Sequence, residues 1–452
     1  MPQTPLNRAQ QAFLRLVRQQ AYASAVNALS RMHPADLAAL FNYLPENEQK
    51  WFAENILRVG KLPKVVSELE PSFVPQLLEF ISEDELLRSL QSMEPDDAVD
   101  ILSGLSEEKR KEIFEKLTGA QKIAVGKLLG YAPDTAGGIM TTDYVAMPEI
   151  AVASEAITTL RQQEKRPEIP YIYITDAHQK LVGAVSFKDL VLSAPNTKLA
   201  DIMARDPIAV WAGKSQESVA TMIAKYNLLA VPVVDEHHRL IGQITVDDAI
   251  DVLYEEATED IYHLGSLGQE EHIATSVATS TKWRAPWLLI NLGTAILAAA
   301  TVSLFSDTIS RYVVLAVMMP IVAGMGGNAG TQSLTVVTRG LALGEVDWSI
   351  GWKVLLKEVS VGFLNGAING VVMGLITWGW YHNFTLAAIM FFAMIGNLII
   401  AGLFGALVPL MLKKMNLDPA LGSSIIVTTA TDVGGFFVFL GLATVLIKYL
   451  VA

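Results

Sequence analysis

Long apolar stretches without charged residues distinguish residues 283–452 from the rest of the chain. Residues 285–306 and 312–338 contain no charged residue, and residues 359–412 contain none apart from His382. A membrane-spanning helix requires about 20 predominantly apolar residues. The pattern therefore predicts five transmembrane spans, at residues 285–306, 313–338, 353–379, 385–412 and 420–447.

Basic residues beside the predicted spans indicate how the chain crosses the membrane. Those that precede the first span, follow the second or separate the fourth from the fifth all fall on one side: Lys282, Arg284, Arg339, Lys353, Lys357, Lys413 and Lys414. Loops on the cytoplasmic side are enriched in Lys and Arg. We therefore expect residues 1–282 to be cytoplasmic and the C-terminus to lie outside. The N-terminal residues lack an apolar run, so we expect no cleaved signal peptide.

Residues 8–130 show the spacing of amphipathic helices. Apolar residues recur three or four positions apart, as in Leu37, Leu40 and Phe41. Proline followed by acidic residues, typical of a helix start, occurs at Pro34 and Pro95. The pattern predicts an all-α stack of short helices, whose handedness it leaves open.

Residues 134–260 contain an internal repeat. Gly183 and Gly242 are 59 residues apart, as are Asp189 and Asp248, and each copy has the pattern strand, turn, strand, helix. The repeat resembles a tandem pair of CBS domains, an α/β fold, over about 120 residues. CBS pairs often bind an adenine nucleotide through a Ser or Thr followed three residues later by Asp.

Two positions match that nucleotide signature: Ser186 with Asp189, and Thr245 with Asp248. The same spacing is typical of an N-cap, in which Ser or Thr opens the helix after the second strand. The two interpretations are compatible, because a capping residue can also contact a ligand.

Charge is distributed unevenly between the two halves. Residues 283–452 hold six acidic and eight basic residues, so 40 of the 46 acidic and 26 of the 34 basic residues lie in residues 1–282. Acidic self-repulsion there disfavours the compact state unless a cation binds. The net charge of −12 without a basic stripe makes nucleic acid an unsuitable partner, and the lack of cysteine excludes disulfides and thiolate chemistry.

An acidic helix follows the second CBS copy. Asp247, Asp251, Glu255 and Glu259 are spaced four residues apart, which places them on one helix face. They are flanked by Asp248, Glu256 and Asp260. Mg²⁺ and Ca²⁺ take carboxylate and water oxygens as ligands, so a divalent cation would remove the repulsion. The alternative is a solvated acidic surface.

A second acidic cluster, Asp96, Asp97 and Asp100, lies in the helical N-terminal region. It is either the opposing face of a cation site or an ordinary helix start. These patterns predict a multidomain membrane protein. Its expected parts are a helical acidic N-terminal domain at 1–132, a CBS pair at 133–250, a connecting helix at 251–282 and a transmembrane domain at 283–452.

Asp432 lies near the middle of the fifth predicted span. An ionised acid at the bilayer centre costs roughly 2.5–3.5 kcal/mol on insertion scales, and no basic residue lies at matching depth in this sequence. Neighbouring Thr428, Thr429 and Thr431 supply hydroxyl groups, which favours a water-filled path with a cation site. A protonated packing contact and a proton relay are the alternatives.

The second span carries Gly324-Met-Gly-Gly-Asn-Ala-Gly-Thr-Gln-Ser333 after Pro320. These residues are expected to loosen the helix in mid-membrane, where irregular backbone is tolerated if it lines a cavity. Close packing of small residues, as at Gly326 and Gly330, is the alternative. The two interpretations carry equal weight and can both hold.

The order of these parts resembles the MgtE family of magnesium channels over nearly the whole chain. The glycine-rich segment 324–333, Thr431-Asp432 and Ala257-Thr-Glu-Asp-Ile261 match that family's signatures. The resemblance implies a homodimer in a bacterial plasma (inner) membrane, with a pore on the dimer axis. It also implies that Asp432 binds hydrated Mg²⁺ and that Thr428 is a pore-backbone position.

The resemblance implies further roles for cytosolic residues. The positions that match intracellular Mg²⁺-sensing acids are Asp248, Asp251, Glu256, Glu259 and Asp260 on the connecting helix, Glu217 in the second CBS copy, and Asp96 and Asp97 in the N-terminal domain. Tyr171, Lys188 and Asp189 fall where some members bind ATP. The chain departs from the family at Ser424-Ile425, where some members have Asn-Pro, and at Asn227, which replaces an acid.

The sequence therefore predicts an Mg²⁺ channel that imports magnesium down the membrane potential and is closed by cytosolic Mg²⁺. One alternative is a proton- or sodium-coupled exporter of divalent ions under CBS control. Another is a nucleotide-sensing membrane scaffold without transport. An enzyme is not expected, because neither a nucleophile–base pair nor a phosphate-binding loop is found in the sequence.

Overall fold

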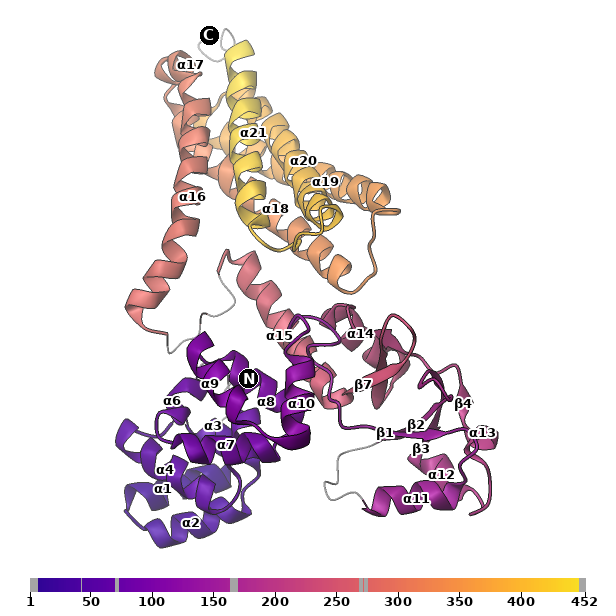
Figure 1. The fold of residues 1–452 in the computed structure, drawn as a ribbon. Helices are drawn as coiled ribbons and strands as arrows, with labels where there is room; N and C mark the ends of the chain where they lie inside the picture. The colour runs from indigo at the N-terminus through magenta and orange to yellow at the C-terminus, as the bar shows by residue number, and fades with distance from the viewer. Residues whose placement is uncertain are drawn as a thin grey trace. The chain divides into compact units, whose positions relative to one another are not determined.

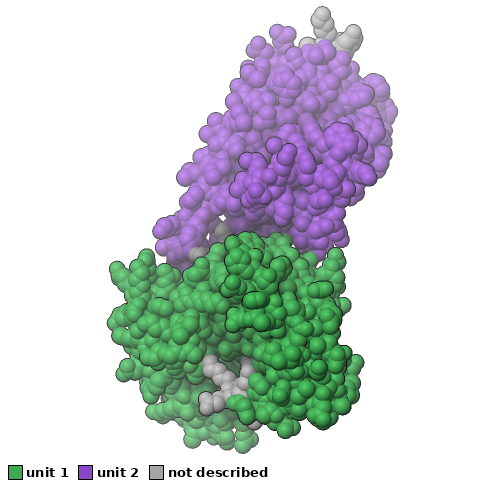
Figure 2. Space-filling model, turned by 45° about the vertical axis from the view of Figure 1, so that its right-hand side comes forward, with its two compact units in different colours: residues 1–253 green, residues 254–452 purple. Residues whose placement is uncertain are grey.

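The computed structural model describes residues 7–41, 43–69, 73–162, 170–267, 271 and 275–446 of the chain. It separates into two compact units, Met1–Leu253 and Tyr254–Ala452, which are coloured differently in Figure 2. The division falls inside a single helix, Val246–Leu264.

The first part of unit 1 is a stack of short helices, as the sequence predicts. Their bounds are α1 Arg8–Arg18, α2 Tyr22–Arg31, α3 Pro34–Phe41, α4 Glu46–Arg58, α5 Leu62–Ser67, α6 Val74–Leu78, α7 Glu83–Ser92, α8 Pro95–Ser103, α9 Glu107–Lys116 and α10 Gly119–Leu128. Capping boxes open α1 at Asn7 and α7 at Ser82. Pro95 occupies the first turn of α8, followed by Asp96 and Asp97.

Two small sheets follow, one for each copy of the repeat. The first sheet has the order β1-β2-β3-β4 and the second β5-β6-β7. In both, a parallel pair is followed by an antiparallel pair. The bounds are β1 Val145–Pro148, α11 Ala153–Gln162, β2 Tyr171–Thr175, β3 Leu181–Ser186, α12 Phe187–Leu192, α13 Leu199–Ile202, β4 Ala204–Arg205, β5 Val210–Trp211, α14 Gln216–Tyr226, β6 Ala230–Val234 and β7 Leu240–Thr245.

The repeated glycines have a packing role that links the two copies. A Cβ on Gly183 would overlap the side chain of Met203, and a Cβ on Gly242 would overlap that of Met140. Each methionine comes from the Ile-Met pair that opens the other copy. The spacing of 59 residues therefore reflects a reciprocal contact between the copies.

The acidic helix follows the second CBS copy directly. Helix α15 runs from Val246 to Leu264, immediately after β7. It ends at Gly265 and Ser266, and Ser266 has a positive φ of 56°, a backbone conformation that interrupts a helix. The next helix, α16, starts at Val277 with Ser276 as its N-cap.

Unit 2 contains five helices long and apolar enough to span a membrane, among the described residues. They are α16 Val277–Ser303, α18 Val314–Ala342, α19 Gly351–Tyr381, α20 Phe384–Lys414 and α21 Ser423–Val445, with the short α17 Ser306–Arg311 after the first. Their positions match the five predicted spans. Figure 1 shows α18 to α21 as one bundle, with α16 beside α21.

Glycines bring α19 and α20 into close contact. A Cβ on Gly362, Gly366 or Gly370 would overlap the α20 backbone at Leu398, Ile395 and Phe391, respectively. Small residues four positions apart are the usual means by which membrane helices approach closely. Helix α18, by contrast, contains Pro320 and the glycine-rich segment yet is continuous. The expected loosening is therefore wrong, and one side of this segment packs against α20 and α21.

Candidate ion pathway and acidic sites

Asp432 projects from the middle of α21 and is half-buried within one chain. Among the described residues, its carboxylate has neither a hydrogen-bond nor an ion-pair partner. Thr428, one turn earlier, is also half-buried. The hydroxyls of Thr429 and Thr431 donate to backbone carbonyls of α21 itself, at 2.6 Å and 2.9 Å, so they offer an ion only their remaining lone pairs.

The glycine-rich face of α18 has both a packed side and an open side. Gly330 is buried, and a Cβ there would lie 2.6 Å from Val427 on α21. Gly324 and Gly327 have no heavy atom within 4 Å of a Cβ position. Asn328, Thr331 and Gln332 are exposed within one chain. The packing interpretation is confirmed for the buried side, and pore lining stays a prediction for the open side.

Asn397 on α20 is a buried polar residue that the sequence reasoning overlooked. It is 0% exposed, and its Nδ2 donates to the Val322 carbonyl of α18 at 2.6 Å. Its Oδ1 is buried without a partner among the described residues. A Cβ on Gly326 or on Gly435 would overlap the Asn397 side chain. Asn397 therefore fixes the spacing between α18 and α21, the helix that carries Asp432.

Glu358 on α19 is a second residue that was overlooked. It is 5% exposed and accepts a hydrogen bond from the Ser333 hydroxyl of α18 at 2.6 Å. Its other oxygen lies 3.1 Å from Nζ of Lys357. The charge of Glu358 near the predicted end of a span is visible in the sequence, whereas its contact with Ser333 on α18 is not.

In unit 1, acidic residues of α8 lie near the start of α15. The Oδ1 atom of Asp96 is buried without a partner among the described residues. Burial raises the pKa of Asp96 well above its usual value, and the charges of Asp248 and Asp97 add to this rise. The structure therefore brings together the N-terminal acids and the second CBS copy.

The pKa values of Asp97 and Asp248 are also raised. Burial, reinforced by Glu94 and Asp100, raises the pKa of Asp97 to about 7. Burial raises the pKa of Asp248 to about 6, although hydrogen bonding from Thr245 opposes the rise. A helix N-terminus normally favours the carboxylate, so desolvation outweighs the helix dipole at Asp97. Groups of this kind are stabilised as anions when a cation binds.

Glu68, next to the end of α5, was not among the predicted acids. Burial raises its pKa, and Asp251 and Asp247 raise it further, whereas His33 lowers it. Glu68 is the C-cap residue of α5, and no sequence pattern singled it out. Its position extends the acidic region from α8 to the exposed face of α15.

The remaining predicted acids are placed elsewhere. Glu217 lies in the first turn of α14. The part of α15 that belongs to unit 2 carries Glu255, Glu256, Glu259 and Asp260. Burial raises the pKa of Asp260, and the charges of Asp418 and Glu256 contribute in the same direction.

The candidate nucleotide residues gather at one end of the first sheet. Tyr171 on β2 pairs with Ser186 on β3. The Ser186 hydroxyl donates to the Asp189 carboxylate at 2.6 Å and caps α12 by accepting from the Asp189 amide, which confirms the cap. Lys188 and Asp189 are exposed. In the second copy, Thr245 donates to Asp248 at 2.5 Å.

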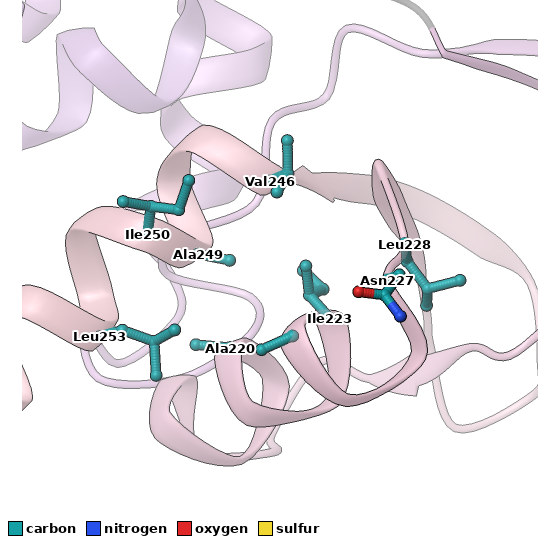
Figure 3. Close-up of a pocket in the computed structure, with 9 residues that line it drawn as sticks. Ala220, Ile223, Asn227, Leu228, Val246, Ala249, Ile250 and Leu253 are labelled. Carbon is teal, nitrogen blue, oxygen red and sulfur yellow. The ribbon is translucent and has the colours of Figure 1, made fainter.

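A hollow of about 130 Å³ between α14 and α15 does not coincide with these residues (Figure 3). Its walls are apolar, with Asn227 as the polar exception. Such a surface suits neither a metal ion nor a phosphate. Asn227 ends α14 with a positive φ of 51°. Asparagine is well suited to this left-handed backbone conformation.

The shifted carboxyl groups predict a pH-dependent stability. A carboxyl group whose pKa is higher in the folded state stabilises the fold at low pH. This stabilisation is lost as the pH rises from the unfolded-state pKa near 4 through the folded-state pKa. For the full chain in detergent with EDTA, we expect the unfolding temperature of unit 1 to fall by on the order of 5–10 °C between pH 5 and 8. Asp248 and Asp97 ionise in this window. Calorimetry at several pH values measures the slope.

The control for this experiment is the double variant D97N/D248N, in which we expect a shallower slope. An unfolding temperature that is constant or increases over this range in EDTA would contradict the proposed burial of these groups.

Models of known protein families match segments of both units. Residues 319–442 match the MgtE model, described as a divalent cation transporter. Residues 32–134 match the MgtE intracellular N domain, and residues 136–195 and 199–255 each match the CBS domain. The chain is therefore a membrane transporter of the divalent cation class, with a helical domain and a CBS pair before its membrane helices.

Full-length relatives identify the family. The chain is 31% identical to the magnesium transporter MgtE of Bacillus subtilis (strain 168), with 94% of each chain covered. It is 32% identical to the magnesium transporter MgtE of Thermus thermophilus, over 93% of this chain and 94% of the relative. The chain belongs to the MgtE family of magnesium transporters, which confirms the resemblance drawn from the sequence.

Two solved structures match the fold of the part that precedes the membrane helices. The cytosolic domain of the Mg²⁺ channel MgtE in complex with ATP matches with a TM-score of 0.51 and 30% identity, over 54% of this chain and 99% of that one. The soluble part of a magnesium transporter matches with a TM-score of 0.50 and 28% identity, over 55% of this chain and 98% of that one.

Proposed function

We propose that this chain forms a homodimeric Mg²⁺ channel that imports magnesium and closes when cytosolic Mg²⁺ binds its acidic residues. The observation that carries the proposal is the half-buried, unpartnered carboxylate of Asp432 in the middle of α21. A carboxylate at this depth is tolerated when a cation or water accompanies it. Mg²⁺ holds its water tightly, so Asp432 binds the hydrated ion through that water.

The second subunit supplies the other wall of the pathway in this proposal. Asn328, Thr331 and Gln332 on α18 are exposed polar side chains in a helix that must lie in the membrane. Facing a second copy across a water-filled axis would remove the unfavourable contact of these groups with lipid. Two Asp432 carboxylates would then face one ion.

The membrane potential is sufficient to drive import. An inside-negative potential contributes about 4.6 kcal/mol per 100 mV for a divalent ion, twice the single-charge value. This requires the N-terminal region to be cytoplasmic in the bacterial inner membrane, as the basic residues beside the spans indicate. A channel with these features needs no coupling ion.

Closure is assigned to the acidic region of unit 1 and to the acids of α15. The charge of Asp248 contributes to the raised pKa values of both Asp96 and Asp97, so the three acids lie near one another. Cytosolic Mg²⁺ bridging these carboxylates favours the state in which they are close, and repulsion favours separation when Mg²⁺ is scarce. The ion thereby shifts a two-state equilibrium through its different affinity for the two states.

ATP is the second cytosolic ligand in this proposal. Tyr171, Ser186, Lys188 and Asp189 share one end of the first CBS sheet, and the solved relative described above is an ATP complex. The exposed Lys188 would meet the phosphates and the Asp189 carboxylate the ribose hydroxyls. Nucleotide bound there would stabilise the CBS pair next to the sensing acids.

Flux measurements separate the channel from the exporter. In proteoliposomes containing a Mg²⁺-sensitive dye, we expect Mg²⁺ entry that follows an imposed potassium-diffusion potential. Entry should be the same with and without a proton or Na⁺ gradient at fixed voltage, because the channel couples to neither. Flux that requires one of those gradients would favour the ion-coupled exporter, and the lack of any flux would favour the scaffold.

A further inference from the structure

Three segments of unit 2 meet at one end of the helix bundle: the connection between α18 and α19, the start of α19 and the end of α20. A Cβ on Gly351, the first residue of α19, would lie 3.5 Å from the side chain of Leu410 on α20. Val346 of the connection and Val354 of α19 pack against the same apolar cluster as Leu410. These contacts hold the three segments together.

This end of the bundle carries three exposed lysines. Lys353 lies in the first turn of α19, and Lys413 and Lys414 lie in the last turn of α20. Among the described residues, no carboxylate oxygen lies within 4.0 Å of Nζ of any of the three. Lys357, one turn further along α19, is instead paired with Glu358 at 3.1 Å. The other three ammonium groups are therefore available to an anion.

Two exposed tryptophans lie beside these lysines. Trp348 in the connection is 53% exposed, and Trp352, which precedes Lys353, is 66% exposed. The Nζ atom of Lys414 lies 4.2 Å from the centre of the Trp348 ring, a cation–π contact that orients the ammonium group. Tryptophan is enriched where a membrane meets water, because its ring is apolar and its N–H is polar. The two rings therefore suit the level of the lipid head groups.

The connection between α18 and α19 has a defined conformation. The Asp347 carboxylate accepts hydrogen bonds from the Ser349 hydroxyl at 2.6 Å and from the Ile350 amide at 3.1 Å. Gly344 has a positive φ of 68° just after α18, which glycine adopts without strain. The acid next to Trp348 is thus engaged by its own segment, and the ring is held near the end of α20.

The net charge of these segments is positive. Residues 339–358 and 410–417 contain five basic and three acidic residues. The segments therefore favour a negatively charged ligand. A zwitterionic lipid would bring its own ammonium group towards the lysines, whereas an anionic lipid brings only its phosphate charge.

We propose that the start of α19 and the end of α20 form a binding site for the phosphate of an anionic phospholipid. Lys353, Lys413 and Lys414 supply the positive charge, and the two tryptophans contact the lipid at head-group level. Basic pockets between membrane helices bind lipid head groups of this kind, including that of cardiolipin. The lipid would join the ends of two helices that the apolar cluster already brings together.

The competing explanation is that the lysines only orient the chain during membrane insertion. Basic residues beside a span have this role in general, and it requires no lipid site. Orientation does not account for the contact between Lys414 and Trp348, which joins segments far apart in the sequence. It also predicts that phospholipids bind here without regard to their charge.

Native mass spectrometry of the full-length protein in detergent, titrated with cardiolipin or phosphatidylcholine, separates the two explanations. We expect the wild type to prefer cardiolipin. The variant K353Q/K413Q/K414Q should bind its tightest cardiolipin about 100-fold more weakly, because each lysine near an anionic lipid contributes about fivefold. The matched control K109Q/K198Q/K225Q removes three exposed lysines of unit 1 and should bind as the wild type does. Equal cardiolipin affinity in the two variants, or no preference in the wild type, would overturn the proposal.

Inorganic phosphate distinguishes a lipid site from a site for the free anion. At matched ionic strength, replacing chloride with phosphate should leave cardiolipin bound to the wild type. Displacement of the lipid by phosphate would overturn the assignment to a lipid.

Photochemical crosslinking gives an independent test that does not depend on the folding of a variant. The wild type is reconstituted into phosphatidylcholine vesicles that contain a minor fraction of cardiolipin with a photoreactive head group. Crosslinked peptides should fall within residues 345–357 and 410–417, and crosslinks confined to other segments would overturn the proposal. Neither experiment measures Mg²⁺ flux, so the outcome does not bear on the proposed import.

Discussion

Replacing Asp432 with asparagine is expected to reduce Mg²⁺ flux by at least about 100-fold. The substitution keeps the size of the side chain and removes its charge. A hydrogen bond to a charged group contributes about 1.5–3 kcal/mol, so the loss of two carboxylates in a dimer removes about 3–6 kcal/mol of ion stabilisation. Each 1.4 kcal/mol corresponds to a tenfold change in an equilibrium constant. Dye-loaded proteoliposomes at a fixed membrane potential measure the flux.

The matched control is D307N, which neutralises an exposed acid in the first turn of α17. This variant should transport as the wild type does. Thermal unfolding of D432N should also be unchanged or shifted upward, because a buried charge without a protein partner does not stabilise the fold. Equal flux in D432N and D307N would remove Asp432 from the ion pathway.

Features set by local composition were predictable from the sequence. The five spans follow from uncharged runs of sufficient length, and the helices of the N-terminal region follow from apolar spacing and proline starts. The CBS pair follows from a repeat whose glycines accept methionines of the opposite copy. Asp432 was identifiable because a lone acid in an apolar span is a conspicuous exception.

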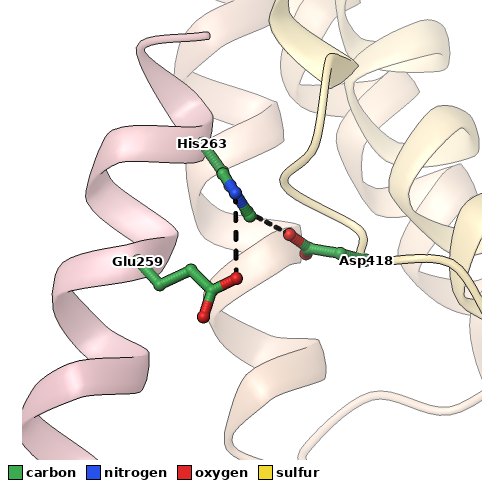
Figure 4. A group of neighbouring side chains, drawn as sticks. All are labelled: Glu259, His263 and Asp418. Atoms are coloured by element: carbon green, nitrogen blue, oxygen red, sulfur yellow. Dashed lines mark hydrogen bonds and ion pairs between the residues drawn. The ribbon is translucent and has the colours of Figure 1, made fainter. Parts of the chain in front are cut away.

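Features that depend on contacts between distant segments were not predictable in this way. The Asn397 amide donates to a carbonyl on α18 that is 75 residues away, and Ser333 and Glu358 meet across two helices. The continuity of α18 also depends on its neighbours, because glycine and proline alone indicated a looser helix. Glu259 and His263 have a helical spacing visible in the sequence, but the contact of His263 with Asp418 in the α20–α21 connection is not visible there (Figure 4).

Neutralising Asp96 and Asp248 together is expected to leave the channel open at high cytosolic Mg²⁺. Two effects oppose each other in D96N/D248N: repulsion between the acids is relieved, and ligands for the closing ion are lost. A pair of like charges costs only a few tenths of a kcal/mol at an exposed site, whereas binding of an ion at 100 times its dissociation constant stabilises a state by about 2.7 kcal/mol. Even with a larger repulsion in this partly buried cluster, loss of ion binding should dominate.

Inside-out patch recording, with Mg²⁺ applied to the cytosolic face, measures this effect. The concentration that halves the current should rise by at least about tenfold in D96N/D248N, which corresponds to about 1.4 kcal/mol of lost coupling. The matched control is D201N/D206N, which neutralises two exposed acids of the CBS region. Asparagine suits position 206 because Asp206 has a positive φ of 49°. If both double variants close at the same Mg²⁺ concentration as the wild type, sensing does not depend on the acids that α8 and α15 bring together.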